Sequence, residues 1–447
     1  SLSFSKKLED HIGAIGTLFI TSVIQLLRRF IYHLKKALPP LEMMMNLNWL
    51  AGAANRYEGC IRSMLELMLE RPPLKGSFVD TKIHSVTGEN YGAHSGLRGP
   101  DFTYGWIQAR ALEALLGFAE FYRDRDAEFS ERLIKRARIL FDAMRALQQR
   151  DGHIFFLYNK NMEPIRPGPN GNQLQSSEPD IFTYSDAFSA KGLFAASKIL
   201  APDYTAASRA YLLAVIDAVE AGRFQMDESV SIRQEAAAMQ PDDFGPRMIL
   251  LGAAGLLHRL GESKETGFAD RFIDHVLERH YDPKTGLLLN IPGEDKCNVG
   301  HIIEFCGFAF DHLLARPQDT RLENIGLALA KSLEYGLQGP GIALYLSAHT
   351  GQAISPYYPW WPMPEAIRAC ALGLHLGLET GLADYWQRAD QAFFTHYWQP
   401  EKGYAFQTRN ISGPVDFVPA TPDLDPAYHT GLSLLAANRA ISQMLLA

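Results

Sequence analysis

The segment Asp282-Pro283-Lys284-Thr285-Gly286-Leu287-Leu288 is a turn followed by apolar residues, and it lies between two long helix-forming stretches. Residues 151–156 and 400–406 repeat this arrangement, each directly after an amphipathic stretch. Asp-Pro and Gly steps mark turns, and the apolar residues that follow favour a short strand. Together with residues 222–224 and 341–344, these connections recur every ~55–75 residues, which predicts a repeated unit made of a helix pair.

The stretches between these connections have the apolar spacing of amphipathic helices. Twelve helices, or six pairs, are predicted at 49–71, 103–124, 130–149, 182–199, 204–221, 245–260, 265–280, 300–316, 321–336, 361–377, 381–397 and 426–445. This pattern predicts an all-α fold, an (α/α)6 barrel of six helix pairs with short β-hairpins in the connecting loops. An open solenoid is the alternative, but it requires polar capping helices, whereas residues 430–446 are strongly apolar. In a closed barrel the inner helices converge on one cavity, so we expect the site at the helix starts.

The composition limits the partners of the chain. Its 447 residues carry a net charge of −7 and contain no run of Lys or Arg, so nucleic acid is not an expected partner. The cysteines have neither CxxC nor His-spaced partners, which predicts reduced thiols, no zinc site and a cytoplasmic protein. They are Cys60, Cys297, Cys306 and Cys370.

The N-terminal part differs from the rest. Residues 12–27 carry no charge and are flanked by basic residues, but they fall short of the ~20 apolar residues that span a membrane. No small-residue cleavage site follows them. We therefore expect residues 1–45 to form an N-terminal extension with an apolar helix, packed or interfacial, and residues 46–447 to form a single catalytic domain. A peripheral membrane anchor is the alternative for the extension.

Gly300-His301-Ile302-Ile303-Glu304 opens a predicted inner helix. His301 and Glu304 are three residues apart and share a helix face, so the carboxylate can orient the imidazole and raise its basicity. This is the arrangement of a general base with its orienting group. A solvent-facing polar pair is the alternative.

Residues 359–365, Pro-Trp-Trp-Pro-Met-Pro-Glu, open another predicted inner helix. The indoles of Trp360 and Trp361 suit the apolar C–H face of a sugar, and Glu365 offers acceptors to its hydroxyl groups. Core packing explains the tryptophans equally well, but an unpaired carboxylate is costly to bury.

Three further residues lie near predicted helix starts. His429 is in the first turn of the last helix, where the positive helix end favours a neutral imidazole. Arg110 lies on a largely apolar helix and is suited to stabilise an enediolate oxygen, unless it pairs with Glu113. Tyr184 begins a helix and either contacts substrate or helps to cap that helix.

Taken in order, these segments resemble the N-acylglucosamine 2-epimerase family, which includes cellobiose 2-epimerases and aldose-ketose isomerases acting on mannose and related sugars. The resemblance covers roughly residues 49–445 and depends on the ordered set of motifs. It implies that His301 and His429 are the two acid/base histidines and that Glu304 is the supporting carboxylate. It also implies that Arg110 holds the reacting oxygens, and that Tyr184, Trp361 and Glu365 lie at the sugar pocket.

One segment departs from the family pattern. Where members commonly have Asn-x-x-Met-His, this chain has Gly245-Pro246-Arg247-Met248-Ile249, and Gly252 replaces the glutamate that follows. One wall of the sugar pocket is therefore expected to differ. Arg247 offers a contact to an acidic or phosphorylated sugar, with a surface salt bridge as the alternative.

The expected chemistry is removal of the C2 proton of an open-chain reducing sugar, through a cis-enediolate. Return of the proton to C2 gives an epimer and delivery to C1 gives a ketose, and neither route needs a metal or organic cofactor. The alternatives are a glycoside hydrolase on the same barrel that uses Glu304 and Glu365, and a sugar-binding barrel without catalysis. The expected partner is a small sugar, and the chain is expected to be a monomer or homodimer.

Overall fold

The computed structural model describes residues 47–378, 381–417, 421 and 423–446. The expected N-terminal extension, residues 1–45 with its apolar helix, lies outside them. The described part is mostly helical, as predicted, and each predicted helix overlaps an observed one. The helices are α2 (Leu47–Glu70), α3 (Gly105–Tyr122), α4 (Ala127–Asp151), α5 (Tyr184–Leu200), α6 (Thr205–Glu220), α7 (Gln234–Ala238), α8 (Gly245–Arg259), α9 (Gly267–Arg279), α10 (Val299–Leu313), α11 (Arg321–Gly336), α12 (Pro362–His375), α13 (Leu382–His396) and α14 (Ser433–Leu446).

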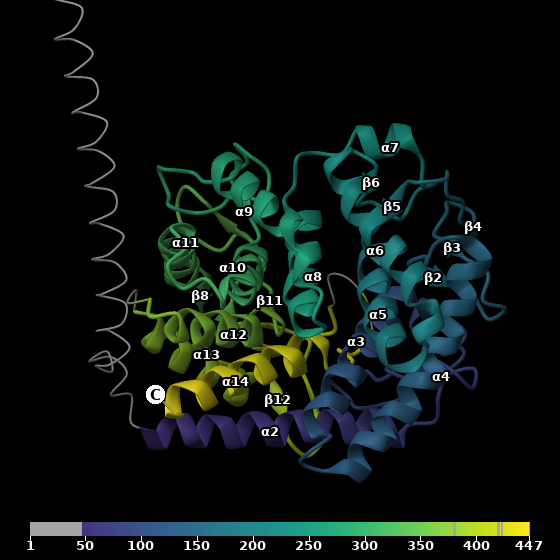
Figure 1. The fold of residues 1–447 in the computed structure, drawn as a ribbon, viewed down its shortest axis with the longest axis horizontal. Helices are drawn as coiled ribbons and strands as arrows, with labels where there is room; N and C mark the ends of the chain where they lie inside the picture. The colour runs from purple at the N-terminus through teal and green to yellow at the C-terminus, as the bar shows by residue number, and fades with distance from the viewer. Residues whose placement is uncertain (1–46, 379–380, 418–420, 422, 447) are drawn as a thin grey trace, which may run out of the picture.

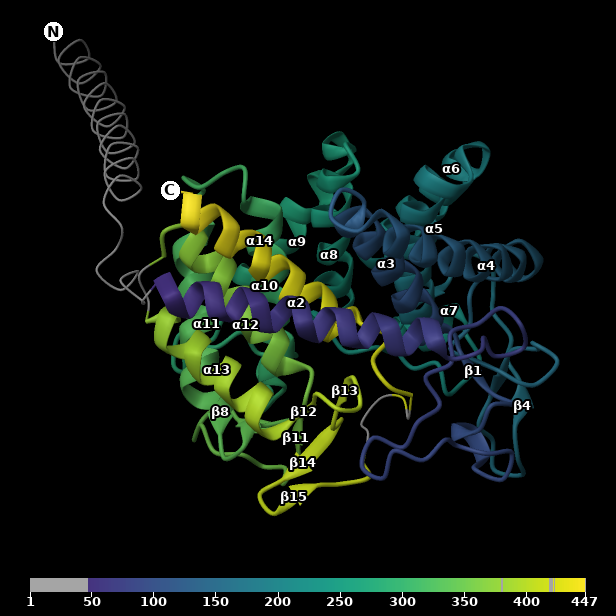
Figure 2. The ribbon, with the colours of Figure 1, turned by 90° about the horizontal axis from the view of Figure 1, so that it is seen from below.

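The helices form an inner and an outer set (Figures 1 and 2). The inner helices contact one another in the order α3, α5, α8, α10, α12 and α14, and the π-helical turn η5 (Tyr428–Leu432) that precedes α14 contacts α3. The outer helices α4, α6, α9 and α11 each contact the inner helix of the next pair, and α13 packs on α12, the inner helix of its own pair. Helix α2, the first described, lies side by side with α14, the last.

The sequence explains which helices are inner. In α10 every residue except His301 and Asp311 is buried, and in α12 every residue except His375 is buried, so these helices are enclosed on all sides. In the outer helix α4 the buried residues recur every three or four positions, as on the single apolar face of an amphipathic helix. Their side chains join one core cluster that extends from Leu50 to Met444.

The connecting loops contain short strands, nearly all of two residues. The antiparallel pairs are β1 (Thr103–Tyr104) with β2 (Leu157–Tyr158), β3 (Ile165–Arg166) with β4 (Gln173–Leu174), β7 (Lys296–Cys297) with β10 (Leu346–Ser347), β8 (Leu337–Gln338) with β9 (Gly341–Ile342), and β12 (Trp398–Gln399) with β13 (Tyr404–Ala405). Strands β11 (Tyr358–Pro359), β14 (Thr408–Asn410) and β15 (Gly413–Pro414) form one antiparallel sheet, and β5 (Phe182–Thr183) pairs in parallel with β6 (Phe224–Gln225).

Two connections differ from the prediction. The short strand expected at residues 151–156 begins just after them, at Leu157, where it pairs with Tyr104 of β1. Residues 282–288 form a turn without a strand, and a single isolated bridge pairs Tyr281 with Leu288.

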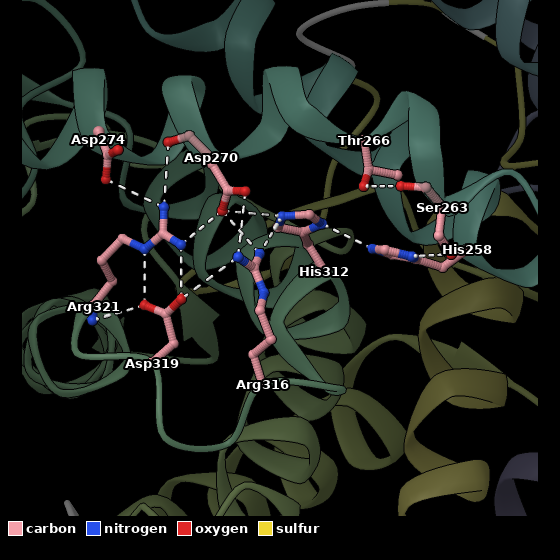
Figure 3. A network of polar contacts seen from close by, with 9 residues as sticks. All are labelled: His258, Ser263, Thr266, Asp270, Asp274, His312, Arg316, Asp319 and Arg321. Carbon is pink, nitrogen blue, oxygen red and sulfur yellow. Dashed lines mark hydrogen bonds and ion pairs between the residues drawn. The ribbon is translucent and has the colours of Figure 1, made fainter. Parts of the chain in front are cut away.

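A polar network joins the last turns of α8 and α10 to the first turns of α9 and α11 (Figure 3). Arg316 donates to His312 Nε2 at 2.7 Å, so His312 donates through Nδ1 to His258 Nε2 at 3.0 Å. Asp270 accepts hydrogen bonds from Arg316 and from Arg321 of α11, at 2.8 and 2.6 Å. These contacts link four helices that are consecutive in the ring.

Among the described residues, no helix combines the length and apolar character needed to cross a bilayer.

Candidate active site

A cavity lies where the six inner helices begin. The first turns of α3, α5, α8 and α10, the segment before α12 and the η5 turn all contribute to its lining, which is where the repeated helix pairs predicted a site. Of the residues singled out from the sequence, those that line it are Arg110, Tyr184, His301, Glu304, Trp360, Trp361 and His429, and Trp106 of α3 lines it as well. Glu365 and Arg247 do not line this cavity.

His429 is held in place from two sides. Asp425 accepts hydrogen bonds from the backbone N–H groups of Tyr428, His429 and Thr430, at 3.0–3.2 Å, which fixes the π-helical turn. The buried carboxylate of Glu365 accepts a hydrogen bond from His429 Nδ1 at 2.9 Å. A proton on Nδ1 leaves Nε2 as the nitrogen available to a ligand.

Glu365 orients His429 from behind the cavity. It is 1% exposed and forms an ion pair with Arg368, one helical turn further along α12. Burial alone would raise the pKa of Glu365, but Arg368 and His429 outweigh it and hold the pKa below its ordinary value. Glu365 also lines a second cavity, of about 890 Å³, and is therefore placed to act on the imidazole rather than on a ligand in the first cavity.

Glu304 does not have the partner that its spacing predicted. No hydrogen bond between His301 and Glu304 is recorded among the described residues, and Glu304 Oε1 lies 3.9 Å from His429 Nδ1. That oxygen is buried without a hydrogen-bond partner, and burial, followed by the charge of Glu365, raises the pKa of Glu304. The carboxylate that orients an imidazole is Glu365.

His301 faces the cavity from the first turn of α10. The side chain of Asn298 caps this helix by accepting a hydrogen bond from the backbone N–H of His301. Burial, and secondarily the charge of His429, lowers the pKa of His301 to about 4. At neutral pH the imidazole of His301 is therefore uncharged and able to accept a proton.

Trp361 packs against both histidines. Its ring centroid is 5.6 Å from that of His301 and 5.5 Å from that of His429, with interplanar angles of 36° and 39°. Gly300 makes this close packing possible, because a Cβ at that position would collide with the Trp361 ring. The glycine before His301 therefore has a steric role.

Arg110 places a cation in the cavity without a carboxylate partner. Its guanidinium lies 4.3 Å from the ring centroid of Phe188 and 5.5 Å from that of Tyr428. No ion pair of Arg110 is recorded in the described part of the chain. Glu113, the alternative partner considered from sequence, pairs with Lys191 at 3.2 Å. Burial lowers the pKa of Arg110, but guanidinium groups remain charged in proteins.

The two glycines that depart from the family pattern, Gly245 and Gly252, are explained by the side chains packed against them. A Cβ at Gly245 would collide with the Tyr184 hydroxyl, and a Cβ at Gly252 would lie 2.7 Å from the Phe308 ring. Neither position has room for a larger side chain. With Met248 and Ile249 lining the cavity, this wall is apolar where the family pattern has polar groups.

Arg247 points away from the pocket. Its guanidinium lies 3.9 Å from Asp242 Oδ1, and it packs over Phe272 of α9. The expected contact between Arg247 and an acidic sugar has no support in this geometry. The salt-bridge alternative is the one that the structure favours.

Several residues near the site were missed in the sequence. Lys191 is fully buried and donates to the Tyr428 hydroxyl at 2.7 Å, which places a second cation behind the cavity. Its signal was a lysine in the middle of α5, where the neighbouring residues are small or apolar. Arg368 and Asp425 had no local signal, because their partners are brought to them only by the fold.

Three ligand atoms of Glu304, Glu365 and His429 lie within 4.8 Å of one another and could hold a metal ion. His429 Nδ1 and Arg368 both already engage Glu365, so a metal ion there would compete with a hydrogen bond and an ion pair.

Comparison with known proteins shows a similarity of fold to solved structures. No family model matches the chain, and no curated protein matches it either. The chain is similar to the cellobiose 2-epimerase of Spirochaeta thermophila DSM 6192, with a TM-score of 0.66 and 14% identity over 90% of this chain and 100% of that one. For the cellobiose 2-epimerase of Bacillus thermoamylovorans B4167 the TM-score is 0.65, with 13% identity over 86% of this chain and 98% of that one. A structure described as a D-mannose isomerase has a TM-score of 0.65 and 12% identity, covering 86% and 97%.

Proposed function

We propose that the protein is a carbohydrate 2-epimerase or aldose-ketose isomerase of the N-acylglucosamine 2-epimerase family. In this proposal the ring of inner helices is a closed (α/α)6 barrel, and residues 46–447 form a single catalytic domain. The observation that carries the proposal is the pair of imidazoles, His301 and His429, which both pack against the Trp361 ring and both line one cavity. The shared fold with sugar epimerases and a mannose isomerase supports it.

The two histidines have different surroundings, which suits opposite roles in proton transfer. His301 is neutral at pH ~7, so it is ready to take the C2 proton of an open-chain sugar. His429 has a carboxylate on Nδ1, which stabilises a positive charge on its ring and suits it to donate from Nε2. In the reverse reaction the roles exchange.

Arg110 stabilises the intermediate. Removal of the C2 proton puts negative charge on the carbonyl oxygen, and a guanidinium without a carboxylate partner is suited to bind a cis-enediolate. Trp361 and Trp360 offer faces for the C–H side of the sugar. The scheme uses no metal or organic cofactor.

The test is proton exchange in heavy water. The protein is incubated with free aldoses and ketoses, and proton NMR follows the C2 signal. We expect exchange with the wild type, loss of exchange with His301→Ala and with His429→Ala, and no loss with His94→Ala, because His94 is exposed in a loop. Exchange that persists in both cavity variants would overturn the proposed roles.

The glycoside hydrolase alternative is less well supported. It needs two carboxylates that face the substrate. Glu365 is buried, does not line the cavity and is engaged by both Arg368 and His429. The heavy-water experiment separates the two functions, because a hydrolase does not label sugar carbon.

A further inference from the structure

A second group of potential ligand residues lies outside the ring, where the loop before α8 meets the end of α9. Asp242 Oδ1 lies 3.5 Å from His275 Nε2 and 3.9 Å from His280 Nε2. The three ligand atoms lie within 4.8 Å of one another. Helices α8 and α9 are neighbours in the ring (Figure 1). None of the three residues lines the cavity proposed for the sugar.

His280 determines the chemistry of this group. Its Nδ1 lies 2.8 Å from the carbonyl oxygen of Leu289 and must carry a proton to make that hydrogen bond. In the neutral ring Nε2 then has a free lone pair. His280 is 1% exposed, and its Nε2 has no hydrogen-bond partner, so a buried acceptor is directed at Asp242. The Nε2 atom of His275 is likewise buried without a hydrogen-bond partner.

Asp242 Oδ1 and His280 Nε2 are both acceptors, so a cation between them would satisfy both. The separations from Asp242 Oδ1 are 3.9 Å to His280 Nε2, too long for a hydrogen bond, and 3.5 Å to His275 Nε2, at the outer limit of one. They are close to the ~3.4 Å that separates two ligands of a tetrahedral ion with bonds of ~2.1 Å. A backbone carbonyl that fixes the tautomer of a histidine is also the usual outer partner of a histidine bound to a metal.

We propose that Asp242, His275 and His280 bind a divalent transition-metal ion of the zinc class. Two imidazole nitrogens and one carboxylate oxygen are ligands that Zn²⁺ accepts, with water in the remaining position. Cysteine spacing predicted no metal site in this chain, because these ligands are not cysteines and come from a loop and a helix end.

Two arginines modulate this site in different ways. Arg279 donates to the other oxygen of Asp242, Oδ2, at 3.0 Å, which orients the carboxylate and leaves Oδ1 for the ion. Arg247 lies 3.9 Å from Oδ1 itself, so its charge competes with the ion. The ion would join the loop before α8 to α9, and the first turn of α8 carries Met248 and Ile249 of the cavity wall.

The experiment is zinc binding by the full chain. Protein stripped with EDTA is titrated with ZnCl2 by isothermal titration calorimetry, and Co²⁺ absorption reports the coordination geometry. We expect one Zn²⁺ per chain, a tetrahedral Co²⁺ spectrum and a higher melting temperature with zinc. His275→Gln, at a partly exposed ligand, should weaken binding by about tenfold or more. Asp242→Asn should have the same effect.

The controls separate this site from others. His94→Gln, at an exposed histidine, and His429→Ala, in the other three-ligand group, should bind zinc as the wild type does. Arg247→Gln should bind zinc several-fold more tightly, because it removes the competing charge. Absence of zinc binding, or binding that is unchanged in both His275→Gln and Asp242→Asn, would overturn the proposal. Sugar exchange by the stripped protein is a separate measurement and tests only the proposed function.

Discussion

At the scale of single residues, the protonation of His301 sets the acid limit of the proposed reaction. His301 must be neutral to accept the C2 proton, and its lowered pKa keeps it neutral down to about 4. We therefore expect kcat/KM to fall as the pH drops through about 4, rather than through the ordinary imidazole value of ~6.5. Initial rates over a pH series, with stability checked at each pH, measure this limb. An acid limb near the ordinary value contradicts the role of His301.

Glu365 gives a second prediction at this scale. Glu365→Gln keeps the size of the side chain but removes the charge that stabilises a protonated His429. We expect kcat to fall by about 10²–10⁴, with a much smaller change in KM, by analogy with carboxylates that orient a catalytic histidine. Steady-state kinetics and thermal melting check it. The matched control is Glu262→Gln, which alters a carboxylate in a peripheral ion pair with Lys198.

A Glu365 variant that loses only substrate affinity, with kcat unchanged, would show that Glu365 binds sugar and does not position His429.

Sequence motifs predicted individual site residues better than they predicted partners. His301, His429, Arg110 and Trp361 were singled out from local patterns and do meet at one cavity. The pairing of Glu304 with His301 was wrong, because side chains on one helix face need not touch when another helix approaches. The partner of His429 is Glu365, which lies 64 residues away in the sequence. Such pairs depend on the packing of α12 against the η5 turn, which no local pattern contains.

At the scale of helices, the network of Figure 3 makes stability depend on pH. Burial, and then the charge of Arg316, lowers the pKa of His312 to about 4, below its ordinary value. Between pH ~6.5 and ~4 the imidazole of His312 is protonated in the unfolded chain but stays neutral in the folded protein. The free energy of unfolding therefore falls as the pH drops through this range. The loss from this 3% exposed side chain is about 2–3 kcal/mol.

Urea unfolding of the wild type and of His312→Gln at pH ~7 and ~5 measures this contribution. We expect the variant to be less stable at the higher pH and to have a smaller pH dependence than the wild type. His94→Gln, at an exposed histidine, should keep the full dependence. Equal pH dependence in the wild type and in His312→Gln contradicts the prediction.

Helices were more predictable than the turns between them. The regular spacing of apolar residues predicted helices whose bounds lie within a few residues of the observed ones. Helix α2, for example, was predicted at 49–71 and is observed at Leu47–Glu70. The five-residue helix α7 was missed, because one turn of helix has no measurable period. The last inner helix begins with the π-helical turn η5, which Asp425 and a left-handed Ala427 impose. Hydrophobic spacing does not report such a turn.

At the scale of the whole molecule, the ring joins the first and last described helices. Helix α14 packs between α2 and α12, and one core cluster extends from Leu50 to Met444. Opening the ring at any pair would expose apolar surface on both neighbours, so the pairs should unfold together. In guanidinium we expect coincident transitions by far-UV and near-UV circular dichroism. Two separated transitions would contradict the proposed single domain.

Because Trp361 packs against the imidazoles of both His301 and His429, its fluorescence depends on their charge. A protonated imidazole draws electrons from an excited indole beside it and quenches its emission, whereas a neutral ring does so far less. The brightness of this one indole, isolated by subtracting the spectrum of Trp361→Phe, therefore reports how much positive charge its two neighbours hold. The fluorescence of Trp361 can therefore follow protonation of the two imidazoles in a stopped-flow experiment, without a coloured substrate.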